Sequence, residues 1–351
     1  MAKTKAAEME ELKELALSIV RAQTNVYVKE LLRAHGVRIG ATKSDFDRNL
    51  LKAIDNEVLT REHFEEWLQQ VEGWGEQHVY AYRLTEQLKR DFTTEELARK
   101  RVEAARLSKY WRKPTATTAH LDFSADEKLS LVSITYADSL LFHWHKGTQY
   151  WVRSKDEEQH DKPREWIDGF EYEFRAYRGR AMREVMRFEV RPSDGLAAMF
   201  VPKPINSKEH KAAYEQVRKT IDRVLNFSTL EGRRLAVGDI IKNLDQKLAF
   251  DADAAKEIRP RSTRLRSGDA YVEFSALSQE GSYFDSGDVL KLRSTLRTDA
   301  DIGVFEGAAG TFRFGNQGRV ELFADDRRIR LWSSLTAAGV WSILRVLRDR
   351  Q

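Results

Sequence analysis

The chain has 351 residues, enough for two or three domains that each bury a hydrophobic core. It contains no cysteine, which excludes structural disulfides, thiol nucleophiles and cysteine-based zinc sites. Charged residues make up 32% of the chain and no apolar run is long enough to cross a bilayer, which argues against a membrane-spanning helix.

The charge balance is mildly basic, with a formal net charge of +4 and a pI of about 9.0. Such a balance is compatible with a nucleic-acid partner but does not require one. The start of the chain is a charged amphipathic helix without the apolar core of a signal peptide. We therefore expect an intracellular protein, cytoplasmic or associated with a nucleoid or nucleus, that has no membrane partner.

Residues 1–112 predict an all-helical domain, because their apolar residues recur at helical spacing and no proline precedes Pro114. The segment around Val79 and Tyr82 is expected to be one of these helices. The composition changes in the proline- and threonine-rich stretch 113–118, which we interpret as a domain boundary.

Beyond this boundary the apolar residues alternate with a period of two, which predicts antiparallel strands separated by turns. Residues 118–250 are expected to form an antiparallel sheet with a long helix. Its strands are predicted at 120–123, 128–136, 139–145, 149–153, 170–177, 182–191 and 196–202, and its helices at 207–227 and 239–248. A charged loop is expected at 155–164.

Residues 262–351 predict a second, smaller α+β unit that ends in a helix. Its strands are expected at 269–275, 302–305, 311–314, 319–323 and 327–332, and its helices at 287–296 and 335–348. The two units either share one sheet or dock on each other. The predicted fold class is therefore α+β and multidomain, with a helical N-terminal domain followed by antiparallel-sheet α+β domains.

The segment 28–54 predicts two helices joined by an extended loop. Gly36 suits the positive φ that closes a helix, and Thr42 can cap the next one. Basic residues lie on the loop and on the helix faces opposite the apolar positions. They are Lys29, Arg33, Arg38, Lys43, Arg48 and Lys52.

This pattern resembles the SAP motif, a small helix–extended loop–helix module that binds DNA. Residues at five positions of the motif carry the resemblance: Gly36, Val37, Lys43, Phe46 and Leu50. Two positions depart from it, because Gly40 lies one residue early and Asn49 stands where the motif has arginine. The resemblance implies that this segment contacts DNA phosphates. The two departures affect the path of the loop and the phosphate contacts that the motif would make.

Two later runs are rich in arginine. In the first, Arg183, Arg187 and Arg191 share strand parity and are expected to form a stripe, and Gly179 is interpreted as a hairpin turn. Arginine suits phosphate because its planar fork donates two parallel hydrogen bonds. The second run is interpreted as a flexible linker. Nucleic-acid-binding residues are predicted in both runs, at Arg175, Arg178, Arg180, Arg183 and Arg187, and at Arg259, Arg261, Arg264 and Arg266.

His143 and His145 are candidate metal ligands, because they lie two apart on an expected strand and so project from one face. No third ligand has a spacing that joins them, and a polar sheet face is the simpler explanation. We therefore predict no metal and no cofactor.

Catalytic patterns are weak. The acidic pairs Glu171 with Glu173, and Asp269 with Glu273, lack the lysine that a metal-dependent nuclease strand usually carries. Residues 303–310 lack the lysine and hydroxyl residue of a phosphate-binding loop, and no nucleophile elbow occurs. No catalytic residue is predicted.

The favoured hypothesis is a non-catalytic nucleic-acid-binding protein, with duplex DNA preferred over RNA and phosphate contacts dominant. The order of a helical domain, a sheet domain and a terminal α+β unit also resembles the centromere-protein-N family, whose helical domain contacts DNA. Two alternatives stay open. One is a protein–protein adaptor that uses exposed aromatic residues, and the other is a metal-dependent nuclease.

Overall fold

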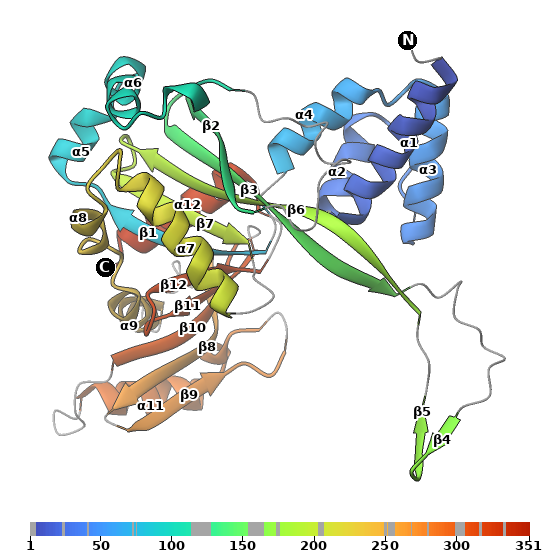
Figure 1. The fold of residues 1–351 in the computed structure, drawn as a ribbon. Helices are drawn as coiled ribbons and strands as arrows, with labels where there is room; N and C mark the ends of the chain where they lie inside the picture. Colours follow the sequence, from blue (N-terminus) through green and yellow to red (C-terminus); the bar gives the residue numbers. More distant parts are fainter. Residues whose placement is uncertain are drawn as a thin grey trace.

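The structure is a computed structural model that describes residues 5–22, 25–40, 42–71, 74, 76–113, 128–153, 165–172, 176–202, 207–248, 251, 257–267, 269–278, 281–298, 306–315, 318–332 and 335–351. Antiparallel strands form its centre (Figure 1). They are β1 (Gln77–Arg83), β2 (Ser130–Tyr136), β3 (Leu140–Arg153), β6 (Tyr177–Arg191), β7 (Leu196–Pro202), β8 (Ile258–Ser267), β9 (Ala270–Ser275), β10 (Glu306–Phe314), β11 (Gly318–Phe323) and β12 (Arg328–Leu331). A separate hairpin pairs β4 (Glu165–Ile167) with β5 (Phe170–Tyr172).

The ten strands form one continuous sheet in the order β2-β3-β6-β7-β1-β12-β11-β10-β8-β9. The two halves of the sheet meet where β1 pairs with β12, with Gln77 opposite Leu331 and Val79 opposite Ile329. The two α+β units considered from the sequence therefore share a single sheet. The fold is mixed α+β, and its sheet joins residues from both ends of the chain.

Helices surround this sheet (Figure 1). Four precede the first strand, namely α1 (Lys5–Ala22), α2 (Asn25–Ala34), α3 (Lys43–Asp55) and α4 (Arg61–Val71). The others are α5 (Glu86–Asp91), α6 (Glu95–Ala104), α7 (Ser207–Ile221), α8 (Phe227–Glu231), α9 (Val237–Leu248), α11 (Gly287–Thr298) and α12 (Ala337–Arg348). In the described part of the chain, no helix is both long enough and apolar enough to cross a membrane.

Two hydrophobic cores lie on opposite faces of the sheet. On one face, Tyr80 and Tyr82 of β1 pack with side chains of α6, α7 and α8. On the other face, Val79 and Ala81 pack with α9, α12 and the N-terminal helices. The hydroxyl of Tyr27 in α2 donates to the carbonyl oxygens of Trp74, at 2.6 Å, and Leu335, at 2.8 Å. These bonds fix the N-terminal helices to the second core.

The prediction of an all-helical segment 1–112 is wrong at β1. This strand lies in the middle of the sheet, between β7 and β12, and every residue from Gln77 to Tyr82 is buried. A strand buried on both faces does not show the alternation of apolar and polar residues that identifies a half-exposed strand. The helices α5 and α6 follow β1, so the boundary at 113–118 does not separate helices from sheet.

Other predicted boundaries also differ from those in the structure. β3 continues through Lys146 and Gly147, where the sequence indicated a turn, and β6 continues through Gly179, which pairs with Trp151. The expected linker contains β8, and the long helix ends at Ile221. In contrast, the strand at 196–202 is confirmed as β7. The predicted segments 120–123, 155–164 and 302–305 lie outside the described residues, as does Arg175.

Candidate nucleic-acid interface

Helices α2 and α3 and the loop between them form the expected helix–extended loop–helix arrangement. We call residues 25–55 the helix–loop–helix module. Gly36 has φ +66°, the left-handed conformation that glycine adopts without a Cβ penalty. The N–H of Val37 donates to the carbonyl of Leu32 at 2.8 Å, which closes α2. At the start of α3, the Thr42 hydroxyl accepts from the N–H of Asp45, whose carboxylate accepts from the N–H of Thr42.

The loop of this module is held against α3. The side-chain amide of Asn49 donates to the carbonyl oxygen of Arg38 at 2.9 Å. Gly40 lies so close to Asp45 that any Cβ at this position would collide with that side chain. Val37 and Ile39 are partly buried against the core. Asn49 and Gly40, the two positions that depart from the SAP pattern, thus both take part in contacts between this loop and α3.

The basic side chains of the module are mostly exposed. Arg33, Arg38 and Lys52 form no side-chain hydrogen bond or ion pair with any described residue. Arg48 pairs with Asp45, and the ammonium of Lys29 lies 5.8 Å from the centre of the Phe46 ring. Lys43 begins α3, and its side chain lies outside the described set. The exposed cations are available to an anionic partner.

The arginine stripe of β6 exists but is directed inward. Arg183 and Arg187 are 5% and 2% exposed, so the expectation of a phosphate-contacting stripe is wrong for these two residues. The guanidinium carbon of Arg187 lies 3.4 Å from the centre of the Trp74 ring and 4.9 Å from that of Phe200. Strand parity was predicted correctly, but no local pattern indicates that an indole covers this face. The side chains of Arg178 and Arg180 lie outside the described set.

His143 lies opposite Arg187 in the ladder between β3 and β6. Burial, together with the positive charges of Arg187 and Arg183, lowers the pKa of His143 to about 3. The imidazole is therefore neutral near pH 7. Among the described residues, no three histidine or acidic side chains gather in a group that would hold a metal ion.

The second arginine run is not a flexible linker, because it forms strand β8, which lies between β10 and β9 in the sheet. Arg264 pairs with Glu273 of β9 at 2.7 Å, and Arg266 pairs with Glu306 of β10 at 3.0 Å. Because Glu273 is engaged by Arg264, it is poorly placed to act with Asp269 as a metal-binding pair. Arg261 instead donates to the carbonyl of Gly281 at 2.6 Å.

The structure brings these β8 arginines onto one sheet face with arginines that the sequence analysis did not select. Their side chains project from β8, β10, β11 and β12 on the face opposite α9. They are Arg259, Arg264, Arg266, Arg313, Arg319, Arg328 and Arg330. The available signal was that arginine alternates with apolar residues in the segments FRF, GRVELF and RRIRLW. Such alternation places the arginine side chains on one face of a strand. In Figure 1, β8 and β9 lie away from α2 and α3, whereas the chain just after β12 reaches α2, where the Tyr27 hydroxyl donates to the Leu335 carbonyl oxygen.

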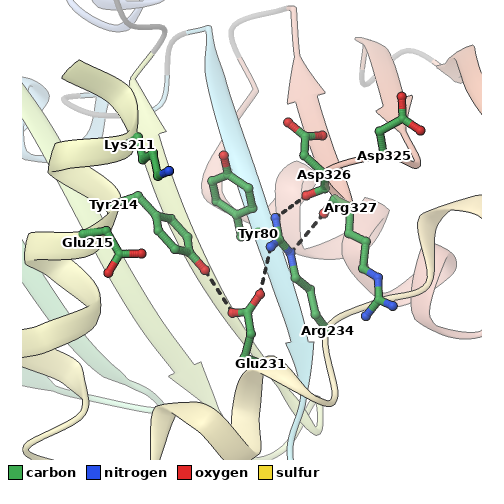
Figure 2. A pocket seen from close by; sticks show the side chains of 9 residues that line it. All are labelled: Tyr80, Lys211, Tyr214, Glu215, Glu231, Arg234, Asp325, Asp326 and Arg327. Carbon is green, nitrogen blue, oxygen red and sulfur yellow. Dashed lines mark hydrogen bonds and ion pairs between the residues drawn. The ribbon is translucent and has the colours of Figure 1, made fainter. Parts of the chain in front are cut away.

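A pocket of about 540 Å³ lies beside this face, between α7 and the turn after β11 (Figure 2). The Tyr214 hydroxyl donates to Glu231 at 2.9 Å, and Glu231 also accepts from Arg234 at 2.9 Å. The Arg234 guanidinium carbon lies 4.3 Å from the centre of the Tyr80 ring. Burial raises the pKa of Tyr80 to about 12, so its hydroxyl stays protonated at neutral pH. The polar groups at this pocket mainly bind one another.

Comparison with known proteins adds no family assignment. No family model matches the chain, and no curated protein matches it.

Proposed function

We propose that the protein is a non-catalytic nucleic-acid-binding protein whose helix–loop–helix module contacts the phosphates of duplex DNA. One observation supports this most directly: Arg33, Arg38 and Lys52 are exposed on a module of fixed geometry and have no described side-chain partner. Cations that are not neutralised within the protein favour a polyanion, because binding releases the counterions condensed on it.

The SAP-like pattern of the module supports duplex DNA as the partner. The extended loop is short and held by Asn49, so Arg38 is presented from a defined backbone position. A fixed loop loses little conformational entropy on binding. Contacts of this kind position a protein on the duplex without reading its sequence.

The proposal is tested by titrating the full chain against duplex DNA of random sequence at several salt concentrations. The double variant Arg38→Ala, Lys43→Ala removes two charges from the loop and the start of α3. We expect weaker binding and a salt slope smaller by about two, since each phosphate contact contributes about 0.9. The matched control Arg99→Ala, Lys100→Ala removes two exposed charges from α6. Absence of binding at low ionic strength, or an equal effect of the control, contradicts the proposal.

A second candidate function is a protein–protein adaptor. The observation that favours it is the β3–β6 ribbon, which projects from the sheet and exposes Trp151 and Tyr177. Phe170 in the β4–β5 hairpin is 68% exposed. Aromatic residues are enriched in protein interfaces. For an adaptor, Trp151→Ser should reduce capture of a partner protein and leave duplex DNA binding unchanged.

A further inference from the structure

The half of the sheet formed by β8 to β12 has one face whose described side chains belong to neither hydrophobic core, and we call it the open face. On its other face, a Cβ added at Gly307 of β10 would contact Ile241 of α9, which places that helix there. Arginine and aromatic residues are prominent on the open face.

Three of these arginines form a row across adjacent strands. Arg259 of β8 lies directly opposite Arg313 of β10, and Arg313 lies directly opposite Arg319 of β11. The row continues into Trp332, whose backbone N–H donates to the backbone carbonyl of Arg319 at 3.1 Å. We call Arg259, Arg313, Arg319 and Trp332 the arginine row.

Like charges in this arrangement destabilise a sheet, because neighbouring strands are only about 4.8 Å apart. Elsewhere on the face the arginines alternate with glutamates, as Arg264 does with Glu273. The arginine row contains no acidic residue. Arg319 reaches Glu321 in its own strand at 3.1 Å, whereas Arg313, in the centre, forms no hydrogen bond or ion pair with any described residue. The row is thus a concentration of positive charge on a rigid support.

The indole beside the row supplies an aromatic surface. Trp332 is 38% exposed, and the guanidinium carbon of Arg330 lies 3.6 Å from the centre of its ring. The guanidinium carbon of Arg319 lies 4.9 Å from the same centre. Aromatic and guanidinium planes both stack on nucleobases when these are not held within a duplex.

We propose that the arginine row binds a single strand of nucleic acid, with its guanidinium groups on the phosphates and a base stacked against Trp332. Charge selects a polyanion, and arginine donates paired hydrogen bonds to phosphate. The exposed indole selects a strand with free bases, because the bases of a duplex are already stacked on each other. This inference rests on the proposed function only for the class of ligand, since the arginine row projects from the sheet face opposite α9, whereas the buried residues of the helix–loop–helix module belong to the core on the α9 face.

The test uses fluorescence anisotropy of the full chain with labelled oligo-dT, oligo-U and duplex DNA. Arg313→Gln removes the central charge without breaking a described contact. We expect its Kd for the single strand to rise about fivefold, and the salt slope to fall by about 0.7, the contribution of one contact on a single strand. Trp332→Ala should raise the same Kd about tenfold through lost stacking. The two oligonucleotides distinguish single-stranded DNA from RNA as the preferred source of this ligand.

Two controls separate this inference from the proposed function. Arg99→Gln removes one exposed charge from α6 and should leave single-strand binding unchanged. Arg38→Ala with Lys43→Ala should weaken duplex binding alone. The unfolding midpoint of Arg313→Gln should equal or exceed that of the wild type, because like-charge repulsion is removed.

The proposal is overturned if the wild type does not bind either oligonucleotide at low salt, or if Arg313→Gln binds them as tightly as the wild type. It is also overturned if Arg313→Gln weakens duplex and single-strand binding equally, since the row would then not select free bases. Loss of duplex binding in the Arg38 and Lys43 variant with retained single-strand binding supports both sites. Retained duplex binding in that variant overturns only the role of the module.

Discussion

The indole nitrogen of Trp341 donates a hydrogen bond of 3.1 Å to a carboxylate oxygen of Glu189, which is 152 residues earlier in the chain. Glu189 is buried in β6, and its other oxygen accepts from Arg191 at 2.6 Å and from Ser139 at 2.8 Å. The guanidinium of Arg191 in turn lies over the Trp341 ring, at 4.5 Å. These contacts attach α12, the last helix, to the first half of the sheet. The C-terminal unit 262–351 is therefore tied to the rest of the fold.

Replacing Glu189 by alanine should lower the free energy of unfolding by about 3 kcal/mol, because Arg191 and the Trp341 indole lose their acceptor in a buried setting. Urea denaturation measures the change. The matched control is Glu103→Ala, which breaks an exposed i,i+4 pair with Arg99 and should cost less than about 1 kcal/mol. Equal midpoints for the two variants would show that Glu189 does not tie α12 to β6.

The lowered pKa of His143 leads us to expect that the free energy of unfolding decreases in acid. Its pKa is about 3 in the folded protein against 6.5 in the unfolded chain, so the unfolded chain binds a proton first as the pH falls. The free energy of unfolding therefore falls below about pH 6.5, by up to about 1.4 kcal/mol per pH unit. His143→Gln should reduce the difference in unfolding free energy between pH 7 and pH 5 by about 2 kcal/mol.

The measurement is urea denaturation of both proteins at the two pH values. Comparing each protein with itself removes the packing loss that the substitution causes at both pH values. An unchanged pH dependence in His143→Gln would assign the acid sensitivity to other groups.

Strands that have one polar face could be predicted from the alternation of apolar and polar residues in the sequence. β11 alternates exposed or partly exposed residues with buried ones, and it was predicted within one residue of its observed bounds. β9, in which Phe274 is buried between exposed neighbours, was also predicted within one residue. β1 was missed because both its faces are covered, so Tyr80 and Val79 look alike in sequence. The prediction of a turn at Lys146 was wrong, because Gly147 lies inside β3 and pairs with Arg183 of β6. Local turn preference was overridden by the partner strand, which no local pattern reports.

In the candidate site, too, features that depend on neighbouring residues were predictable, whereas features that depend on distant residues were not. The helix–loop–helix geometry was predictable because Gly36 and Thr42 act locally. The burial of Arg187 was not, since it depends on Trp74, which is distant in the sequence. The arginine row also needed the ladder of the sheet, because alternation assigns a side chain to a face but does not say which residue of the next strand lies opposite.

Close packing of α9 on β10 makes Gly307 intolerant of a side chain. A Cβ built there would lie 2.8 Å from Ile241 Cβ and would also collide with the backbone carbonyl of Gly238. We expect Gly307→Ala to lower the unfolding free energy by about 2 kcal/mol through overpacking. Gly287→Ala is the control, because a Cβ at Gly287 meets no atom within 4 Å. A Gly307→Ala midpoint as high as the control would mean that α9 moves away at little cost.

The loop of the helix–loop–helix module can be disturbed without removing any charge. A Cβ at Gly40 would collide with Asp45, which caps α3 and pairs with Arg48. If duplex binding depends on where the loop places Arg38, Gly40→Ala should raise the Kd for duplex DNA about tenfold, equivalent to about 1.4 kcal/mol. Gly232→Ala is a suitable control, since a Cβ there makes only ordinary contacts at 3.7 Å and beyond. Anisotropy titration at fixed salt decides the matter. Identical duplex affinities for the two variants would show that charge alone, rather than the position of the loop, determines binding.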